Sequence, residues 1–288
     1  MLHQALTSRR FVRWAAEELR AAGVPEPEVS AEVLLAELLG VGRAEVAARD
    51  IPVSGELLDR YRSMVSRRRG REPVQRILGY AYFRKLKLEV DGSVLVPRAD
   101  TESVVDVALR WIDGRGGEAR VLDLGTGSGA IALSVALERP RCEVYASDVS
   151  SAALEVARRN AASSGVEVTF LQADLSSGLE ELAGRIDLLV SNPPYVKSGE
   201  IGALMPEVRL WDPPGALDGG SDGLSFYRRI FAEIPELLAP GAGVILEIGD
   251  GQAQEVFDLG EKAGFRPLGV ERDLAGSERV VAFVWEVR

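Results

Sequence analysis

The sequence predicts an α/β protein in which a small all-helical domain and a β-hairpin linker precede a doubly wound sheet. Three observations predict this order. Apolar residues recur at three- and four-residue spacing early in the chain, the period changes over residues 80–97, and strands then alternate with amphipathic helices. A chain of 288 residues is long enough for two domains. We therefore expect a helical domain over residues 1–78, the hairpin linker over 79–97 and the sheet domain over 98–288.

The first domain is expected to hold four helices. They fall near residues 11–22, 30–39, 43–49 and 54–69. Ser30 is the expected N-cap of the second helix, because its hydroxyl precedes an apolar helical face. The last helix closes with a basic run formed by Arg67, Arg68, Arg69 and Arg71. Cations there complement a helix C-terminus, which is the favoured interpretation; the alternative is a contact patch for an acidic or phosphate-bearing partner.

The linker is expected to form two strands, over residues 82–90 and 94–97, around a turn at residues 91–93. In the sheet domain the pattern predicts strands at residues 120–125, 142–148, 166–174, 185–192, 243–249 and 279–287. Helices are expected at residues 132–138, 151–164, 226–239 and 252–264. Strands that alternate with amphipathic helices indicate a parallel sheet covered on both faces.

Composition excludes several kinds of protein. The single cysteine, Cys142, cannot form an internal disulfide, and no Cys/His cluster is spaced to hold a metal. With His3 as its one histidine, the chain is a poor candidate for catalysis by a histidine base. No apolar run is long enough to span a bilayer and the N-terminus does not resemble a secretory signal, so we expect a cytoplasmic protein.

The net charge of −10 is unevenly spread along the chain. Residues 1–78 carry a net +2 and residues 79–288 a net −12. An acidic sheet domain disfavours tracking along a phosphate backbone, although a local basic patch could still suffice. The charge therefore favours a small-molecule or protein substrate, and we expect no direct readout of nucleic acid.

A glycine loop follows the first predicted strand of the sheet domain. It contains Gly125, Thr126, Gly127, Ser128 and Gly129, with Asp123 two positions before it. Glycines at a strand-to-helix turn allow a ligand to approach the backbone closely. The spacing is neither that of a dinucleotide fingerprint nor that of a P-loop, so the loop is not built for a pyrophosphate or triphosphate. The acid suits a cationic or amino-bearing ligand, and the structural alternative is a tight strand–helix turn.

Acidic residues end the next two predicted strands. Asp148 is placed to hydrogen-bond the ribose hydroxyls of a nucleoside cofactor, or alternatively to cap the following helix. Asp174, with Leu175, would flank an adenine ring. A glycine loop, an acid and an acid on three successive strand ends resemble the S-adenosylmethionine-dependent methyltransferases of the Rossmann-like class. The resemblance implies S-adenosylmethionine as methyl donor and S-adenosylhomocysteine as product.

The predicted strand over residues 185–192 ends in Asn192, Pro193, Pro194 and Tyr195. The prolines stop the strand, but a rigid turn alone does not explain the asparagine before them or the ring after them. A planar NH₂ group is a poor nucleophile because its lone pair is delocalised. The side-chain oxygen of Asn192 and a backbone carbonyl at Pro193 could accept its two N–H bonds and turn the lone pair towards a sulfonium methyl. Pro194 and Tyr195 would shape the slot, and the turn resembles that of methyltransferases acting on adenine N6, guanine N2 or glutamine.

Nearly the whole chain resembles the release-factor glutamine N5-methyltransferases. The matching segments are residues 73–79 (PVQRILG), 96–102 (VPRADTE), 123–133 (DLGTGSGAIAL), 191–196 (SNPPYV), 216–224 (ALDGGSDGL), 226–228, 247–249, Gln252, Asp273 and 278–279. The resemblance implies that the helical domain docks a peptide chain release factor and that the glutamine of its Gly-Gly-Gln motif enters the crevice at Asn192. This chain departs from the family pattern at Ala99, where proline is usual, and at Leu175, where an aromatic residue is frequent.

Several interpretations stay open at the sequence level. Asp100 or Thr101 could cap the next helix, and Arg98 and Glu102 could form a surface ion pair; alternatively the segment latches the hairpin over the cofactor. The rival functions are an exocyclic-amine methyltransferase acting on RNA or DNA, which would need base flipping, and a non-catalytic S-adenosylmethionine-binding scaffold. The acidic sheet domain argues against the first rival and the intact Asn-Pro-Pro-Tyr turn against the second.

Overall fold

The computed structural model describes residues 7–273 and 276–286, and within them the chain divides into two compact units. The helical unit comprises the described residues up to Gly79 together with the distant segment Met205–Trp211. The sheet unit comprises Tyr80–Leu204 and the described residues from Asp212 onward. None of the described helices is both long enough and apolar enough to span a membrane.

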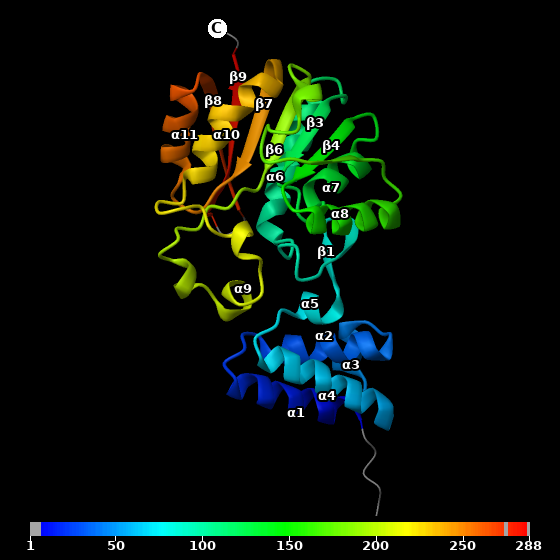
Figure 1. Cartoon of the computed structure of the whole chain (residues 1–288). Helices are drawn as coiled ribbons and strands as arrows, with labels where there is room; N and C mark the ends of the chain where they lie inside the picture. Colours follow the sequence, from blue (N-terminus) through cyan, green and yellow to red (C-terminus); the bar gives the residue numbers. More distant parts are fainter. Residues whose placement is uncertain (1–6, 274–275, 287–288) are drawn as a thin grey trace, which may run out of the picture. The chain divides into compact units, whose positions relative to one another are not determined.

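The helical unit packs around one apolar core (Figure 1). Its helices are α1 (Ser8–Ala21), α2 (Pro27–Leu39), α3 (Arg43–Ala48), α4 (Gly55–Arg69), α5 (Val74–Leu78) and α9 (Pro206–Arg209). Leu19, Leu34 and Val65 are buried at the helix contacts, and the buried Tyr61 donates its hydroxyl proton to the carbonyl of Ala31 over 2.9 Å. Helices α1 to α5 all contribute apolar residues to this core, whereas α9 contributes none.

The prediction that Ser30 caps α2 is wrong. The helix begins three residues earlier, with Pro27 in its first turn, where a missing backbone N–H costs nothing. Ser30 therefore lies inside the helix and is buried, and its hydroxyl accepts a hydrogen bond from Nε of Arg68.

The basic run at the end of α4 is engaged inside the helical unit. Arg68 is buried and lies 2.9 Å from Glu207 of α9, which also receives both ends of the Arg71 guanidinium at 2.8 and 2.6 Å. Arg67 pairs with Glu72 through Nε at 2.7 Å, and Arg69 pairs with a glutamate of α1. The run thus has a structural role, because it ties α4 to the segment that contains Glu207.

In the described sheet unit, seven strands form one sheet in the order β5-β4-β3-β6-β7-β9-β8. The strands are β3 (Arg120–Leu124), β4 (Glu143–Asp148), β5 (Thr169–Gln172), β6 (Ile186–Ser191), β7 (Leu238–Glu247), β8 (Phe265–Arg272) and β9 (Glu278–Trp285). Strands β3 to β7 are parallel, and β9 is antiparallel to both of its neighbours. The prediction of an all-helical N-terminal region followed in the sequence by a doubly wound sheet is confirmed.

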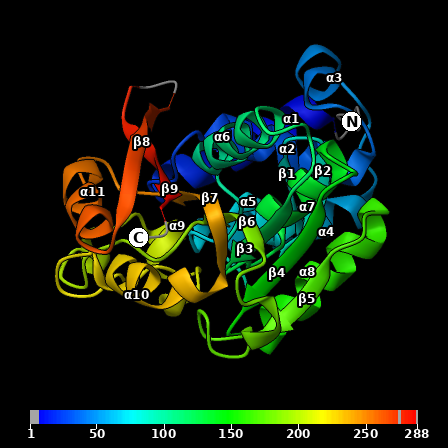
Figure 2. The same ribbon diagram turned by 90° about the horizontal axis from the view of Figure 1, so that it is seen from above.

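Helices cover both faces of this sheet. They are α6 (Glu102–Asp113), α7 (Ala130–Glu138), α8 (Ser151–Ser164), α10 (Ser225–Glu233) and α11 (Ala253–Lys262). Short 3-10 helices are η1 (Ala99–Thr101), η2 (Glu180–Leu182), η3 (Ile201–Ala203), η4 (Pro214–Ala216) and η5 (Ile234–Leu237). Neighbouring strand residues such as Val121 and Leu122 belong to different apolar clusters, the first with α6 and α7, the second with α10 and α11. Figure 2 shows α6 and α10 on opposite sides of β7.

Two local predictions fail for identifiable reasons. Strand β8 was not predicted because Pro267 and Gly269 interrupt its pattern; an edge strand tolerates both, and the pairing with β9 shifts register between them. The hairpin consists of β1 (Tyr80–Phe83) and β2 (Leu86–Glu89), so its turn lies at Arg84 and Lys85 rather than at residues 91–93. No strand forms over residues 94–97, which belong to the described chain.

The order of the strands explains where a site forms. From β3 the chain proceeds outward through β4 and β5, and then returns to the other side of β3 with β6 and β7. The carboxyl ends of β3 and β6 therefore flank the point at which the direction reverses. In open α/β sheets this point opens a crevice for ligands.

Candidate active site

A cavity of about 300 Å³ opens at the carboxyl ends of the parallel strands, and its volume lies at the lower end of the range for ligand pockets. It is lined by ten of the predicted site residues: Gly125, Thr126, Gly127, Ser128, Asp148, Asp174, Leu175, Asn192, Pro193 and Pro194. The structure thus brings together residues from four strand ends. Gly129 and Tyr195, which were also predicted, do not line the cavity.

The glycine loop adopts a conformation that demands glycine. Gly125, Gly127 and Gly129 have φ angles of 74°, 55° and 87°, in the left-handed region. A Cβ on Gly127 would meet no atom within 4 Å, so this backbone is open to a ligand. A Cβ on Gly129 would lie 3.0 Å from Leu133 and 3.3 Å from Ala157, so this third glycine serves the packing of α7 against α8.

Asp123 shapes the glycine loop from inside the protein. Its side chain is buried, and its Oδ2 accepts hydrogen bonds from the Thr126 hydroxyl at 2.6 Å and from the Ala132 N–H at 3.1 Å. Burial raises the pKa of Asp123 to about 7, because a carboxylate loses hydration there. Asp123 does not line the cavity; its hydrogen bonds join the glycine loop to the first turn of α7.

Asp148 lies on the cavity wall and also holds the loop. Its Oδ2 accepts the N–H of Gly127 and its Oδ1 accepts the N–H of Ser150, both at 2.9 Å. Each carboxylate oxygen has a further lone pair for a ligand hydroxyl. The helix-cap alternative for Asp148 is wrong, because Ser150 is the N-cap of α8 and accepts the N–H of Ala153.

Asp174 and Leu175 follow β5 at the same edge. Asp174 is exposed and forms an ion pair with Arg229 at 3.0 Å. Leu175 is buried with a φ of 54°, a left-handed conformation that costs a non-glycine residue on the order of 1 kcal/mol. The surrounding structure holds Leu175 in this conformation at the cavity wall.

The turn after β6 presents one polar atom of known orientation. The amide nitrogen of Asn192 donates a hydrogen bond to Oγ1 of Thr101 over 3.1 Å. Its side-chain oxygen is therefore the atom left to accept a hydrogen bond at the cavity. The Tyr195 hydroxyl instead donates to the buried Glu247 over 3.2 Å, and burial raises the pKa of Tyr195.

Three further residues contact the backbone of this turn: Gln252, Gly219 and Gly223. They lie in the segments that match the family, but the sequence predicted no role for them. Nε2 of Gln252 donates to the Tyr195 carbonyl over 3.2 Å, and its Oε1 accepts the N–H of Gly249. A Cβ on Gly219 would come within 2.8 Å of the Tyr195 Cα, and one on Gly223 within 2.5 Å of the Tyr195 oxygen. The two glycines are needed because the loop packs directly against the backbone of the turn.

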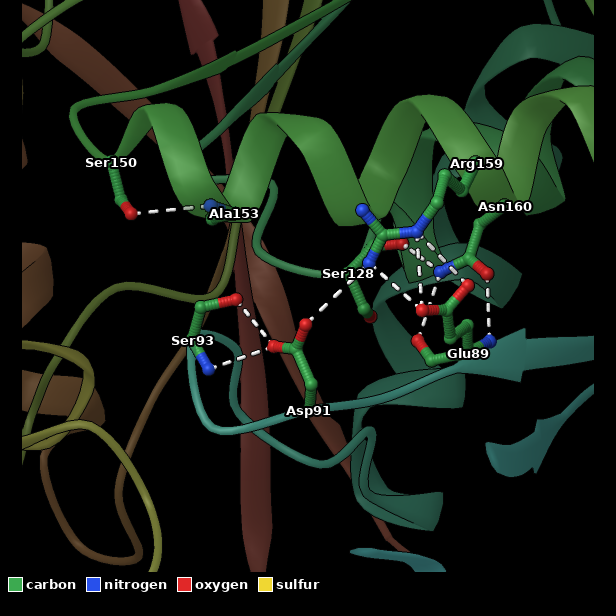
Figure 3. A network of polar contacts seen from close by, with 8 residues as sticks. All are labelled: Glu89, Asp91, Ser93, Ser128, Ser150, Ala153, Arg159 and Asn160. Carbon is green, nitrogen blue, oxygen red and sulfur yellow. Dashed lines mark hydrogen bonds and ion pairs between the residues drawn. The ribbon is translucent and has the colours of Figure 1, made fainter. Parts of the chain in front are cut away.

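The hairpin is fastened to the glycine loop through Asn160 of α8 (Figure 3). Its Oδ1 accepts the N–H of Glu89 at 2.6 Å, and its Nδ2 donates to the carbonyls of Glu89 at 3.1 Å and of Ser128 at 2.9 Å. Arg159 beside it pairs with the Glu89 carboxylate near the surface. Asn160 was not predicted as a site residue, because an asparagine within a helix carries no sequence signal for these contacts.

In the segment over residues 98–102, Arg98 and Glu102 do not pair with each other, but Glu102 does contact the hairpin. Arg98 pairs with the buried carboxylate of Asp212 at 2.6 Å, and Glu102 accepts the backbone N–H of Arg84 at the hairpin turn. Thr101 makes no side-chain cap to α6. Its hydroxyl oxygen instead accepts the hydrogen bond from the Asn192 amide, so this segment lies next to the site.

Within residues 7–273 and 276–286, no group of three or more His, Cys, Asp and Glu side chains is arranged to hold a metal ion. The fold and the site together define a methyltransferase of the Rossmann-like class: a doubly wound sheet with a glycine loop after β3 and an Asn-Pro-Pro-Tyr turn after β6. Residues 106–207 match the methyltransferase small domain. A methyltransferase structure from Pyrococcus furiosus shares the fold, with a TM-score of 0.51 and 20% identity over 70% of this chain and 90% of that one.

The chain belongs to the family of release factor glutamine methyltransferases, and residues 11–79 match the PrmC N-terminal domain. A family member from Rhodospirillum rubrum is 42% identical over 96% of this chain and 84% of its own length. A member from Geobacter sulfurreducens is 41% identical over 96% of this chain and 95% of its own length. A member from Streptomyces coelicolor is 43% identical over 85% of this chain and 86% of its own length. These relatives agree with the predicted glutamine methyltransferase and not with the alternative that acts on RNA or DNA.

Proposed function

We propose that the protein transfers the methyl group of S-adenosylmethionine to the side-chain amide nitrogen, N5, of the glutamine in the Gly-Gly-Gln motif of peptide chain release factors. The observation that carries the proposal is the orientation of the Asn192 side chain. Its NH₂ group is bound to Thr101, so its oxygen can accept a hydrogen bond in the cavity that the glycine loop also lines. S-adenosylhomocysteine is the expected product. Release factors act in translation termination, so we expect the protein to work in the cytoplasm.

The residues present fit a nucleoside sulfonium. Gly127 leaves space for the methionine portion beside its backbone, and Asp148 offers unused lone pairs for the ribose hydroxyls. Leu175 provides an apolar surface, and with Asp174 it would border the adenine ring. When bound, the sulfonium supplies the methyl group.

The protein's own residues orient the acceptor nitrogen. An amide nitrogen is a weak nucleophile, so its position and the direction of its lone pair decide the rate. The Asn192 oxygen and the Pro193 carbonyl would each accept one N–H of the glutamine amide, which holds the nitrogen and favours its rehybridisation. Pro194 narrows the slot from the cavity wall. Tyr195 contributes through the turn, because its hydroxyl is bound to Glu247.

The helical unit is the proposed docking domain for the release factor. Its arginine run at the end of α4 is occupied by internal ion pairs, so we assign docking to other surfaces of these helices. No base readout takes part in this scheme, since the substrate is a protein.

The function is tested by supplying methyl-labelled S-adenosylmethionine with purified release factor in one reaction and with total RNA in another. The release factor should take up label, and Asn192→Ala should lower the rate by about 10²–10³-fold, as removal of one positioned polar partner does elsewhere. Cofactor affinity, measured by calorimetry, should fall much less. Label in RNA alone would overturn the glutamine assignment.

A further inference from the structure

Most backbone N–H groups of the glycine loop are already bound within the protein. Four of the five in residues 125–129 donate hydrogen bonds of 2.8 to 2.9 Å to protein oxygens: those of Gly125, Thr126, Gly127 and Gly129. The acceptors are the carbonyls of Ser147 and Thr126 and the carboxylate of Asp148. In a phosphate-binding loop such N–H groups point at the ligand instead. This loop therefore gives a ligand space beside its backbone but little binding for an anion.

The proposed cofactor nevertheless brings an anion into the cavity. The methionine portion of S-adenosylmethionine has a carboxylate in addition to its ammonium and sulfonium groups. A carboxylate that leaves water needs a cation or several N–H donors in exchange. The acidic side chains of Asp148 and Asp174, which line the cavity, would repel it. Another group of the cavity wall must therefore bind this carboxylate.

Arg98 is the cation of the cavity wall. Among the described residues that line the cavity, no other has a positively charged side chain. Its Nη2 donates to the carboxylate of Asp212 at 2.6 Å, and the Asp212 side chain is fully buried. Within residues 7–273 and 276–286, Nε and Nη1 of Arg98 donate to no protein atom, and 37% of the side chain is exposed. A guanidinium has five N–H donors in one rigid plane, so several remain for a ligand.

We propose that Arg98 binds the carboxylate of S-adenosylmethionine and that Asp212 is the positioning residue that holds the guanidinium at the cavity. This inference rests on the proposed function, because that function names the cofactor. A guanidinium plane held at one nitrogen can donate two parallel N–H bonds to a second carboxylate. The rival interpretation is that the ion pair only fastens the segment around Asp212 to the cavity wall. In that case the loss of Arg98 would weaken every nucleoside ligand alike.

The decarboxylated analogue of S-adenosylmethionine tests this contact by direct binding. It keeps the nucleoside, the sulfonium and the amine, and it lacks only the carboxylate. In calorimetry on the full chain, the wild type should bind S-adenosylmethionine at least about tenfold more tightly than the analogue, the difference that one hydrogen bond between charged groups produces. Arg98→Met should bind the two ligands with equal affinity. Arg98→Lys keeps the charge without the planar fork, so its preference should lie between those of the wild type and Arg98→Met.

Arg84→Met is the matched control. Arg84 is another arginine of the sheet unit that pairs with a largely buried carboxylate, that of Glu138, and it does not line the cavity. Its replacement should lower stability and leave the ratio of the two affinities unchanged. Removal of one member of a buried ion pair can itself prevent folding. The titrations therefore include Arg98→Met combined with Asp212→Asn, which removes both charges of the pair and should also bind the two ligands equally.

The two ligands separate a failure of this inference from a failure of the proposed function. If the wild type binds S-adenosylmethionine and its analogue equally well, or if Arg98→Met keeps the wild-type ratio of affinities, Arg98 does not bind the carboxylate. The proposed function then stands, provided that the wild type methylates the release factor. If the wild type binds neither ligand, the proposed cofactor is wrong, and the function and the inference fail together.

Discussion

Replacement of Asn160 by alanine should be one of the costliest single changes in the sheet unit, although Asn160 touches no reactant. Its side chain is 1% exposed and makes three hydrogen bonds, two to the backbone of Glu89 and one to the Ser128 carbonyl (Figure 3). A net ~0.5–1.5 kcal/mol for each gives a loss of about 3 kcal/mol in the free energy of unfolding. Because Ser128 lines the cavity, cofactor affinity should fall as well.

Arg159→Ala provides the comparison for this change. Arg159 adjoins Asn160 and binds the same Glu89, but both charged side chains are 47% exposed. An exposed ion pair contributes only ~0.2–1 kcal/mol. Urea unfolding of both variants measures the difference through the transition midpoints, and calorimetry with S-adenosylmethionine measures the effect on the loop. Equal losses of stability in the two variants, or unchanged cofactor affinity in Asn160→Ala, would refute the role of Asn160 as a latch between hairpin and loop.

Three further changes have definite expected results. Asp148→Ala should weaken S-adenosylmethionine binding about tenfold or more by calorimetry, since a hydrogen bond to a charged group contributes ~1.5–3 kcal/mol; unchanged affinity would remove Asp148 from the site. Glu207→Ala should destabilise the helical unit by about 3–5 kcal/mol in urea, because it leaves the buried Arg68 without its carboxylate, and a loss below ~1 kcal/mol would contradict this. The pKa values of Asp123 and Glu247 rise from 3.8 and 4.5 to about 7 on folding, so the native state retains protons that the unfolded state has lost. The free energy of unfolding should therefore fall between pH 4.5 and pH 7, by up to ~1.4 kcal/mol per pH unit for each group, and a rise over this range would contradict the prediction.

The elements that local sequence determines were predictable. Helix α8 was expected at residues 151–164 and lies there, because Ser150 caps its start and the left-handed Gly165 ends it. Parallel strands place their carboxyl ends along one edge, so the glycine loop, Asp148, Asp174 and Asn192 could be assigned to one crevice before their contacts were known.

Features that depend on distant partners were not predictable. Arg84 turns the hairpin with a φ of 51°, and its guanidinium is held by Glu138 and Asp106, neither of which is near it in the sequence. The contact of Arg68 with Glu207 joins residues that are far apart in the chain. No local sequence pattern predicts such ion pairs, because each charged residue taken alone is indistinguishable in the sequence from an exposed surface residue.

The role of Tyr195 illustrates the same limit within the site. From sequence Tyr195 was expected to shape the slot for the planar NH₂ group. In the structure its hydroxyl reaches Glu247, and its carbonyl is held by Gln252. The sequence motif includes all three residues, but the pairing between them arises only when β7 and the start of α11 come together behind the turn.

The central claim is that the Asn192 crevice accepts the glutamine of the Gly-Gly-Gln motif. It is tested most directly by incubating the wild-type protein and labelled S-adenosylmethionine with a release factor and with the same factor in which that glutamine is alanine, followed by peptide mapping. The account predicts one methyl group on the side-chain nitrogen of the motif glutamine in the first factor and no label in the second. Equal labelling of both factors would contradict it.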